Sequence, residues 1–108
     1  MRLEWVLKPE ELKALNDFLG ALDKTGFEYY HDPEVRFMIK IRGKIEGLTS
    51  IHGPVYFEQE KYKKININEE PDYIEIKVFD KKKPILYTIK APKDWKISYD
   101  KGYLYIFY

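Results

Sequence analysis

The first hydrophobic pattern along the chain has the period of an α-helix. Within residues 8–26, one stripe of apolar side chains recurs every three or four residues: Leu12, Leu15, Phe18, Leu19 and Leu22. Pro9 stands where the first turn of a helix accepts proline, and Gly26 stands where a left-handed C-terminal cap belongs. The pattern predicts an amphipathic helix that packs its apolar stripe on a core. Gly20 falls on the polar side, where it costs roughly 1 kcal/mol relative to alanine, and the sequence suggests only a close contact with a loop to explain it.

After the helix the period changes to two, which is typical of strands with one buried face. Three stretches alternate in this way: residues 35–42, 72–80 and 84–90. The last two are close enough to form an antiparallel hairpin. If residues 80–83 form a four-residue loop, three apolar pairs face one another on one side: Val78 with Ile85, Ile76 with Tyr87, and Ile74 with Ile89.

Residues 44–68 are less regular. We expect two or three strands in this stretch, interrupted at Gly47, at Gly53 and Pro54, and near Glu60. A single glycine inside a strand pattern often marks a bulge, so Gly47 is a candidate for one.

The sequence ends on a turn followed by six apolar or aromatic residues, "DKGYLYIFY". A three-residue loop over residues 100–102 needs a left-handed backbone only at Gly102, whereas a two-residue loop would force Lys101 to positive φ. The three-residue loop predicts a ladder of facing side chains: Tyr99 with Tyr103, Ile97 with Tyr105, and Trp95 with Phe107. Leu104, Ile106 and Tyr108 then form a second apolar face for a curled sheet, a loop or a partner.

Together these patterns predict an α+β fold over one domain, residues 1–108: a single N-terminal amphipathic helix packed on an antiparallel β-sheet of about five to seven strands. There is no run of eighteen apolar residues and no signal-peptide pattern at the start, so we expect a cytoplasmic protein without a membrane segment. The excess of lysine and glutamate favours a thermophilic source, although an AT-rich genome gives a similar bias.

The composition and the short motifs limit which catalytic and metal sites this protein can have. The chain has no cysteine, which excludes disulfides, thiolate metal sites and thiol nucleophiles. His31, Asp32 and Glu34 lie close together, but Pro33 between them indicates a turn rather than a metal site. Ser50 and His52 lie two residues apart without a third orienting group, as nucleophilic catalysis would require. Adjacent acids such as Glu58/Glu60 and Glu69/Glu70 are expected by chance among 18 acidic residues. We therefore expect a non-catalytic protein without a cofactor.

The preferred hypothesis is a small binding module that acts through a protein surface, with self-association as one form of it. Tyr29, Tyr30 and His31 are the candidate partner surface, because tyrosine buries a large area and keeps a polar tip. The competing interpretation is that Phe27 and one of these tyrosines anchor the segment to the sheet.

Two further hypotheses remain. The net charge of +1 decides neither for nor against nucleic acid. Lysines gathered in the second half of the chain, interleaved with Tyr62 and Tyr73, are candidate nucleic-acid contacts: Lys61, Lys63, Lys64, Lys81, Lys82 and Lys83. Lysines at a hairpin tip also keep the turn soluble, which explains part of the group without any ligand. A small-ligand pocket between the helix and the sheet is the third hypothesis.

Overall fold

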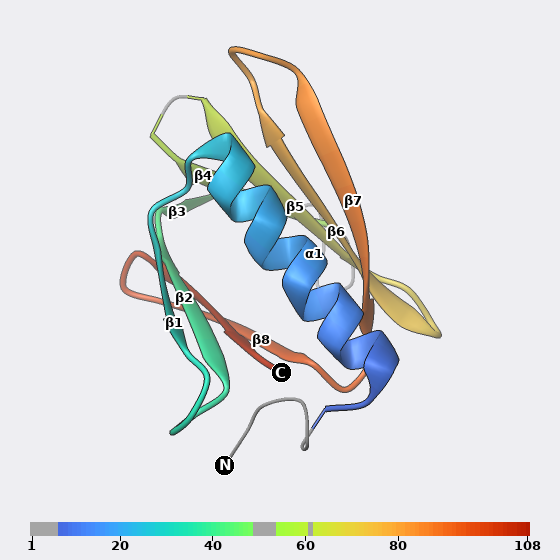
Figure 1. The fold of residues 1–108 in the computed structure, drawn as a ribbon. Helices are drawn as coiled ribbons and strands as arrows, with labels where there is room; N and C mark the ends of the chain where they lie inside the picture. The colour runs from blue at the N-terminus through green and yellow to red at the C-terminus, as the bar shows by residue number, and fades with distance from the viewer. Residues whose placement is uncertain (1–6, 49–53, 61) are drawn as a thin grey trace.

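The computed structural model describes residues 7–48, 54–60 and 62–108, and this part of the chain forms one α-helix followed by nine β-strands (Figure 1). The bounds are α1 (Pro9–Thr25), β1 (Tyr29–Asp32), β2 (Met38–Arg42), β3 (Lys44–Leu48), β4 (Val55–Gln59), β5 (Lys63–Glu69), β6 (Tyr73–Asp80), β7 (Ile85–Pro92), β8 (Lys96–Asp100) and β9 (Tyr103–Phe107). No helix in these ranges is both long and apolar enough to cross a membrane.

The predicted helix is confirmed at both ends. Pro9 opens α1, and Gly26 closes it with a left-handed backbone (φ 79°) and an N–H that donates to the carbonyl of Asp23 at 3.2 Å. Its buried face consists of Ala14, Leu15, Phe18, Ala21, Leu22 and Thr25. Leu15, Phe18 and Leu22 of the predicted stripe therefore face the core with Leu19 packed against it, whereas Leu12 is not part of the core cluster.

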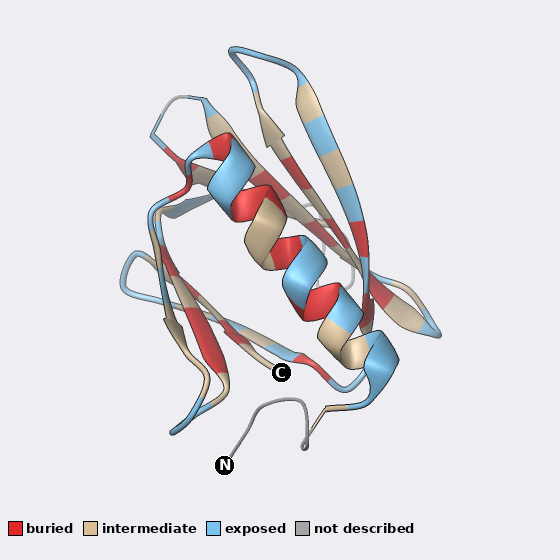
Figure 2. Ribbon diagram, viewed as in Figure 1, coloured by how far each residue is buried: buried red, intermediate tan, exposed pale blue. Residues whose placement is uncertain are grey.

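The nine strands form two antiparallel sheets, and the α+β class is confirmed. Sheet A has the order β1-β2-β9-β8, and sheet B has the order β3-β4-β5-β6-β7. The helix packs on β6 and β7 of sheet B, while sheet A curves across its other side (Figure 1). One cluster of buried apolar residues joins the helix to both sheets, and Figure 2 marks the buried positions in red on the helix and on strands of both sheets. The strands exceed the predicted five to seven because residues 29–69 supply five, including the short β1 and β3.

Sheets A and B are joined without a loop between β2 and β3. Only Gly43 separates these strands, and its N–H donates to the carbonyl of Gly102 at 2.8 Å. A Cβ on this residue would lie 2.5 Å from the carbonyl oxygen of Glu58 and 2.6 Å from the ring of Phe57. Only glycine lets the backbone cross so close to β4. The expected bulge in β3 is also present, since the register shifts between Ile45 and Gly47.

Besides the apolar core, the buried side chain of Gln59 links the two sheets by hydrogen bonds. Gln59, at the end of β4, is 0% exposed. Its Oε1 accepts from the backbone N–H of Glu28 at 2.8 Å, and its Nε2 donates to the carbonyls of Glu28 and Arg42 at 3.0 and 2.8 Å. Every polar atom of the amide group has a backbone partner, either in Arg42 of β2 or in Glu28 just before β1, which is the condition for burying such a group.

The β6–β7 hairpin forms as predicted, but in a register shifted by two residues. Val78 faces Tyr87, Ile76 faces Ile89 and Ile74 faces Ala91. Pro84 has no N–H for the ladder, and Asp80 accepts from the N–H of Lys82 at 2.9 Å, so the turn is longer than four residues. A shift of two keeps every side chain on its predicted face.

The register predicted for the C-terminal hairpin is wrong by one residue. Asp100 pairs with Tyr103 across a two-residue turn in which Lys101 has φ 48° and Gly102 has φ 83°. A one-residue change turns each side chain to the other face. Leu104 and Ile106 are therefore fully buried, and the aromatic residues of β9 point outward. Burying two aliphatic side chains gains about 1.5–3 kcal/mol each, which outweighs the roughly 1–2 kcal/mol cost of left-handed backbone at one lysine.

Candidate functional site

The outer side of sheet A presents a group of aromatic side chains, here called the aromatic face: Tyr30, Tyr103, Tyr105 and Phe107. In β9, Tyr103, Tyr105 and Phe107 alternate with the fully buried Leu104 and Ile106, so they point away from the core. Tyr30 shares their face, because it pairs with Lys40, which in turn pairs with Tyr105. Tyr30 lies on edge strand β1 and is 60% exposed. The other three are partly exposed. β9 lies between β2 and β8, so a paired strand on each side fixes its side chains in place.

The three aromatic rings of β9 form a row. The ring centres of Tyr103 and Tyr105 are 6.1 Å apart, and those of Tyr105 and Phe107 are 6.3 Å apart with planes only 10° from parallel. These separations fall in the range of favourable aromatic pairs. The row therefore offers a rigid apolar strip along the middle of the sheet.

Charges of both signs surround this strip. The Lys40 ammonium lies 4.2 Å from the ring centre of Tyr103, a cation–π distance. Arg42 donates to Glu28 at 2.8 Å, and this ion pair lowers the pKa of Glu28 and raises that of Arg42. Both partners are exposed, so the pair adds little stability. The aromatic face and its edges carry three cations and three acids, which balance: Lys40, Arg42 and Lys96 against Glu28, Asp32 and Asp100.

A shallow hollow of about 480 Å³ lies at the β1 end of this surface. It is lined by Glu28, Tyr29, Tyr30, Lys40, Arg42 and Tyr103. Aromatic rings and charged side chains of both signs therefore line the hollow together.

The proposed partner surface of Tyr29, Tyr30 and His31 is divided between two faces, because consecutive strand residues point to opposite sides. Only Tyr30 joins the aromatic face. The Tyr29 hydroxyl donates to Asp23 of α1 at 2.7 Å, and burial together with this carboxylate raises the pKa of Tyr29 to about 12. Nε2 of His31 lies 2.6 Å from the hydroxyl oxygen of Tyr108, and burial lowers the pKa of His31.

The candidate nucleic-acid lysines do not all lie on one side of sheet B. Lys61 lies outside the described residues. Lys64 points to the outer face and meets Glu46 at 2.6 Å, and Lys81 lies 3.5 Å from Glu46 and 3.7 Å from Glu58. Carboxylates therefore face the two lysines that the sheet brings together.

The remaining lysines of that group have other neighbours. Lys63 points to the helix side, where its Nζ lies 3.7 Å from the point that a Cβ on Gly26 would occupy. A cation at this place complements the negative end of α1. The Lys82 ammonium lies 5.4 Å from the ring centre of Tyr62 at the hairpin tip.

The described residues contain no group of three or more histidine, aspartate or glutamate side chains that could hold a metal ion. Oδ1 of Asp32 instead accepts from the N–H of Val35 at 3.0 Å, which closes the turn after β1. Ser50 and His52 lie outside the described residues.

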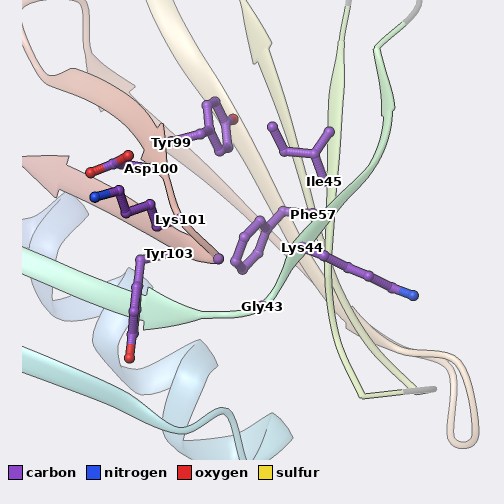
Figure 3. Close-up of a pocket in the computed structure, with 9 residues that line it drawn as sticks. Gly43, Lys44, Ile45, Phe57, Tyr99, Asp100, Lys101 and Tyr103 are labelled. Atoms are coloured by element: carbon purple, nitrogen blue, oxygen red, sulfur yellow. The ribbon is translucent and has the colours of Figure 1, made fainter.

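A cavity of about 220 Å³ opens where the two sheets separate (Figure 3). The rings of Phe57 and Tyr99 stand on opposite walls with centres 6.3 Å apart, and Lys44 and Asp100 lie at the rim. Burial raises the pKa of Tyr99, whose buried hydroxyl has no hydrogen-bond partner among the described residues. A second hollow, of about 350 Å³, lies between α1 and β7.

Comparison of the chain with family models, with curated proteins and with solved structures finds no match in any of the three. Its function is therefore argued from its surface. Sequence reasoning missed Tyr103, Tyr105 and Phe107, because the three-residue loop placed them in the core. The signal that could have found them is the aliphatic pair Leu104 and Ile106, which fits a core better than partly polar tyrosines do.

Proposed function

We propose that this protein is a non-catalytic binding module whose contact surface is the aromatic face, and that its partner is another protein. The observation that carries this proposal is the outward row of Tyr103, Tyr105 and Phe107 on an inner strand of sheet A. Aromatic residues and arginine are the side chains most enriched at the centres of protein interfaces.

Charge favours a protein over a nucleic acid. A phosphate backbone is held by an excess of lysine and arginine, and binding strength follows the number of phosphates neutralised. The three cations around the aromatic face are balanced by three acids, and Arg42 already meets Glu28 at 2.8 Å. A partner with an apolar centre and a rim of both charges matches this surface, whereas a polyanion would be repelled by Asp32 and Asp100.

The proposal is tested by placing a photo-crosslinking amino acid at Tyr105, with Tyr62 as the matched control. Tyr62 is 45% exposed and lies away from the aromatic face, near Lys82. We expect position 105, but not position 62, to capture one protein from the native host. That protein, once purified, should bind the wild type and lose at least about 30-fold in affinity to Tyr105→Ala, the effect of about 2 kcal/mol at a central contact.

Equal capture at both positions, or unchanged affinity in Tyr105→Ala, would refute this use of the surface. Single- and double-stranded oligonucleotides are titrated in parallel at low salt. Binding that weakens steeply with salt and depends on Tyr105 would replace the protein partner with a nucleic acid.

A further inference from the structure

Among the strands of residues 7–48, 54–60 and 62–108, β7 pairs with β6 alone and so forms an edge of sheet B. It is among the longest strands of the described chain, with eight residues in an uninterrupted register (Figure 1). Edge strands carry backbone groups that can pair with another chain. The direction of those groups can be worked out from the neighbouring hairpin.

The carbonyl of Tyr73 accepts from the N–H of Glu70 at 2.9 Å, so Tyr73 bonds toward β5. In an antiparallel ladder the N–H and C=O of one residue point to the same side. Tyr73 and Pro92 therefore form a non-hydrogen-bonded pair of the β6–β7 ladder, and the backbone carbonyl of Pro92 points away from β6. This is the one orientation in which a proline costs the sheet no hydrogen bond.

Alternate residues of β7 share that orientation. Leu86, Thr88 and Lys90 each direct an N–H and a C=O toward the open edge, while Tyr87 and Ile89 bond to β6. The side chains of Leu86, Thr88 and Lys90 are exposed. Thr88 lies at the centre of this set.

The open edge continues into the groove between β7 and α1. Its lining includes Asp17, Gly20 and Lys24 of the helix, together with Thr88 of the strand. A Cβ on Gly20 would meet nothing within 4 Å in the part of the chain that the structure describes, so no contact there requires a glycine. The close contact with a loop that the sequence suggested is thus absent among the described residues. A helix-weakening residue that leaves open space beside a free strand edge suits the close approach of something outside this molecule.

We infer that a second copy of this chain fills the edge, with the two β7 strands pairing antiparallel around a two-fold axis at Thr88. Thr88 then faces Thr88 of the second copy, and Leu86 faces Lys90, so no like charges are opposed. The two five-stranded sheets become one continuous sheet. The contact is closed, because pairing consumes the edge on both copies and leaves no β7 edge for further growth.

The same axis brings the two helices together on one side of the joined sheet. Gly20 and Thr88 both line the groove between α1 and β7, so Gly20 of each copy lies on the side of its helix that faces the axis. Asp17 and Lys24 lie three and four residues on either side of Gly20, so in antiparallel helices Asp17 of one copy meets Lys24 of the other. The helix rests on both β6 and β7. With strands about 4.8 Å apart, this puts the helix axes about 10 Å from each other, the distance of packed helices.

This pairing leaves the aromatic face untouched, since that surface belongs to sheet A. It therefore goes beyond the proposed function, and either one can fail without the other. In the single copy, Asp17 meets Lys13 at 2.7 Å and Lys24 lies 5.7 Å from the ring centre of Tyr87. Both are exposed interactions that a partner can replace.

Sedimentation equilibrium over a concentration series tests the inference. We expect the wild type to reach a dimer, and Thr88→Pro to raise the dissociation constant at least ten-fold, because the proline removes a donor that only the dimer uses. Thr88→Val is the matched control and should remain dimeric. Gly20→Leu should also raise the dissociation constant at least ten-fold while increasing the helix content or thermal stability of the monomer.

A charge exchange tests the axis itself. Asp17→Lys and Lys24→Asp should each weaken the dimer, and the double variant should recover most of the loss. A wild type that stays monomeric throughout the concentration series would overturn the inference. So would a dimer that Thr88→Pro and Gly20→Leu leave intact, a double variant without recovery, or a dimer lost in Tyr105→Ala, which would place self-association on the aromatic face instead.

Discussion

The buried amide of Gln59 offers a direct measure of how strongly the two sheets depend on each other. The informative change is Gln59→Leu, which keeps a similar volume and removes all three hydrogen bonds. It leaves one backbone N–H and two carbonyls without a partner, in a place where the side chain is 0% exposed. Each unsatisfied buried group costs about 1–3 kcal/mol.

Since Glu28 and Arg42 lie near the surface, the lower end of that range applies to their backbone groups. The sum is about 3 kcal/mol of unfolding free energy, which lowers the melting temperature by about 12 °C in a domain of this size. Urea unfolding followed by circular dichroism gives the free energy directly, and differential scanning calorimetry gives the temperature. Asn68→Ala is the control. It removes one amide contact, to Glu70 at 2.7 Å, and should cost less than about 1 kcal/mol.

Gln59→Glu separates the hydrogen bonds from the shape of the side chain. At neutral pH a carboxylate would face two carbonyl oxygens, so its folded-state pKa should rise above the ordinary value of about 4.3. The variant should then be most destabilised at pH 7 and should recover part of its stability as the pH falls through that raised pKa. The reasoning is refuted if Gln59→Leu unfolds within about 1 kcal/mol of the wild type, or if the loss in Gln59→Glu does not depend on pH.

Three further outcomes follow from the backbone and from one histidine. Gly43→Ala should lower the free energy of unfolding by about 2 kcal/mol or more, because its Cβ would lie 2.6 Å from the Phe57 ring. A variant that is as stable as the wild type in chemical denaturation would contradict this close approach. Lys101→Asn should add up to about 1 kcal/mol of stability, since asparagine adopts the left-handed backbone of this turn (φ 48°) more readily, and a lower melting temperature would count against the two-residue turn. Because burial lowers the pKa of His31, the unfolded chain binds a proton first on acidification. The free energy of unfolding should therefore decrease as the pH is lowered beneath about 6.5, and His31→Gln should make this decrease smaller. The same decrease in His31→Gln would show that other groups cause it.

The sequence predicts best those structural elements that residues close together in the chain determine. Pro9, the leucine spacing and Gly26 define α1 without help from the rest of the chain. The β6–β7 hairpin is found by its alternation, yet its register depends on the turn, where Pro84 and Asp80 lengthen the loop by an amount that alternation cannot show. Such a shift is harmless to the core because it moves by two residues.

The C-terminal hairpin shows the limit of local rules. A left-handed backbone at Lys101 is unfavourable by itself, so sequence reasoning rejects the turn that forms. The outcome is decided by Leu104 and Ile106, whose strand partners Ile41 and Ile39 come from a distant part of the chain. The aromatic face was missed for this reason. Gln59 stood out in the sequence only as the single glutamine, and nothing near it indicates its three backbone partners at Glu28 and Arg42.

The position of β9 has a consequence for how this molecule is made. β9 lies between β2 and β8, and Met38 pairs with Phe107, so this contact joins residues far apart in the sequence. During synthesis, sheet B and the β1–β2 hairpin leave the ribosome before the strand that must fill sheet A. Until it arrives, Ile39 and Ile41 have no neighbour in their sheet on that side. The nascent chain therefore keeps an uncovered, aggregation-prone edge at β2 until its ninth strand emerges.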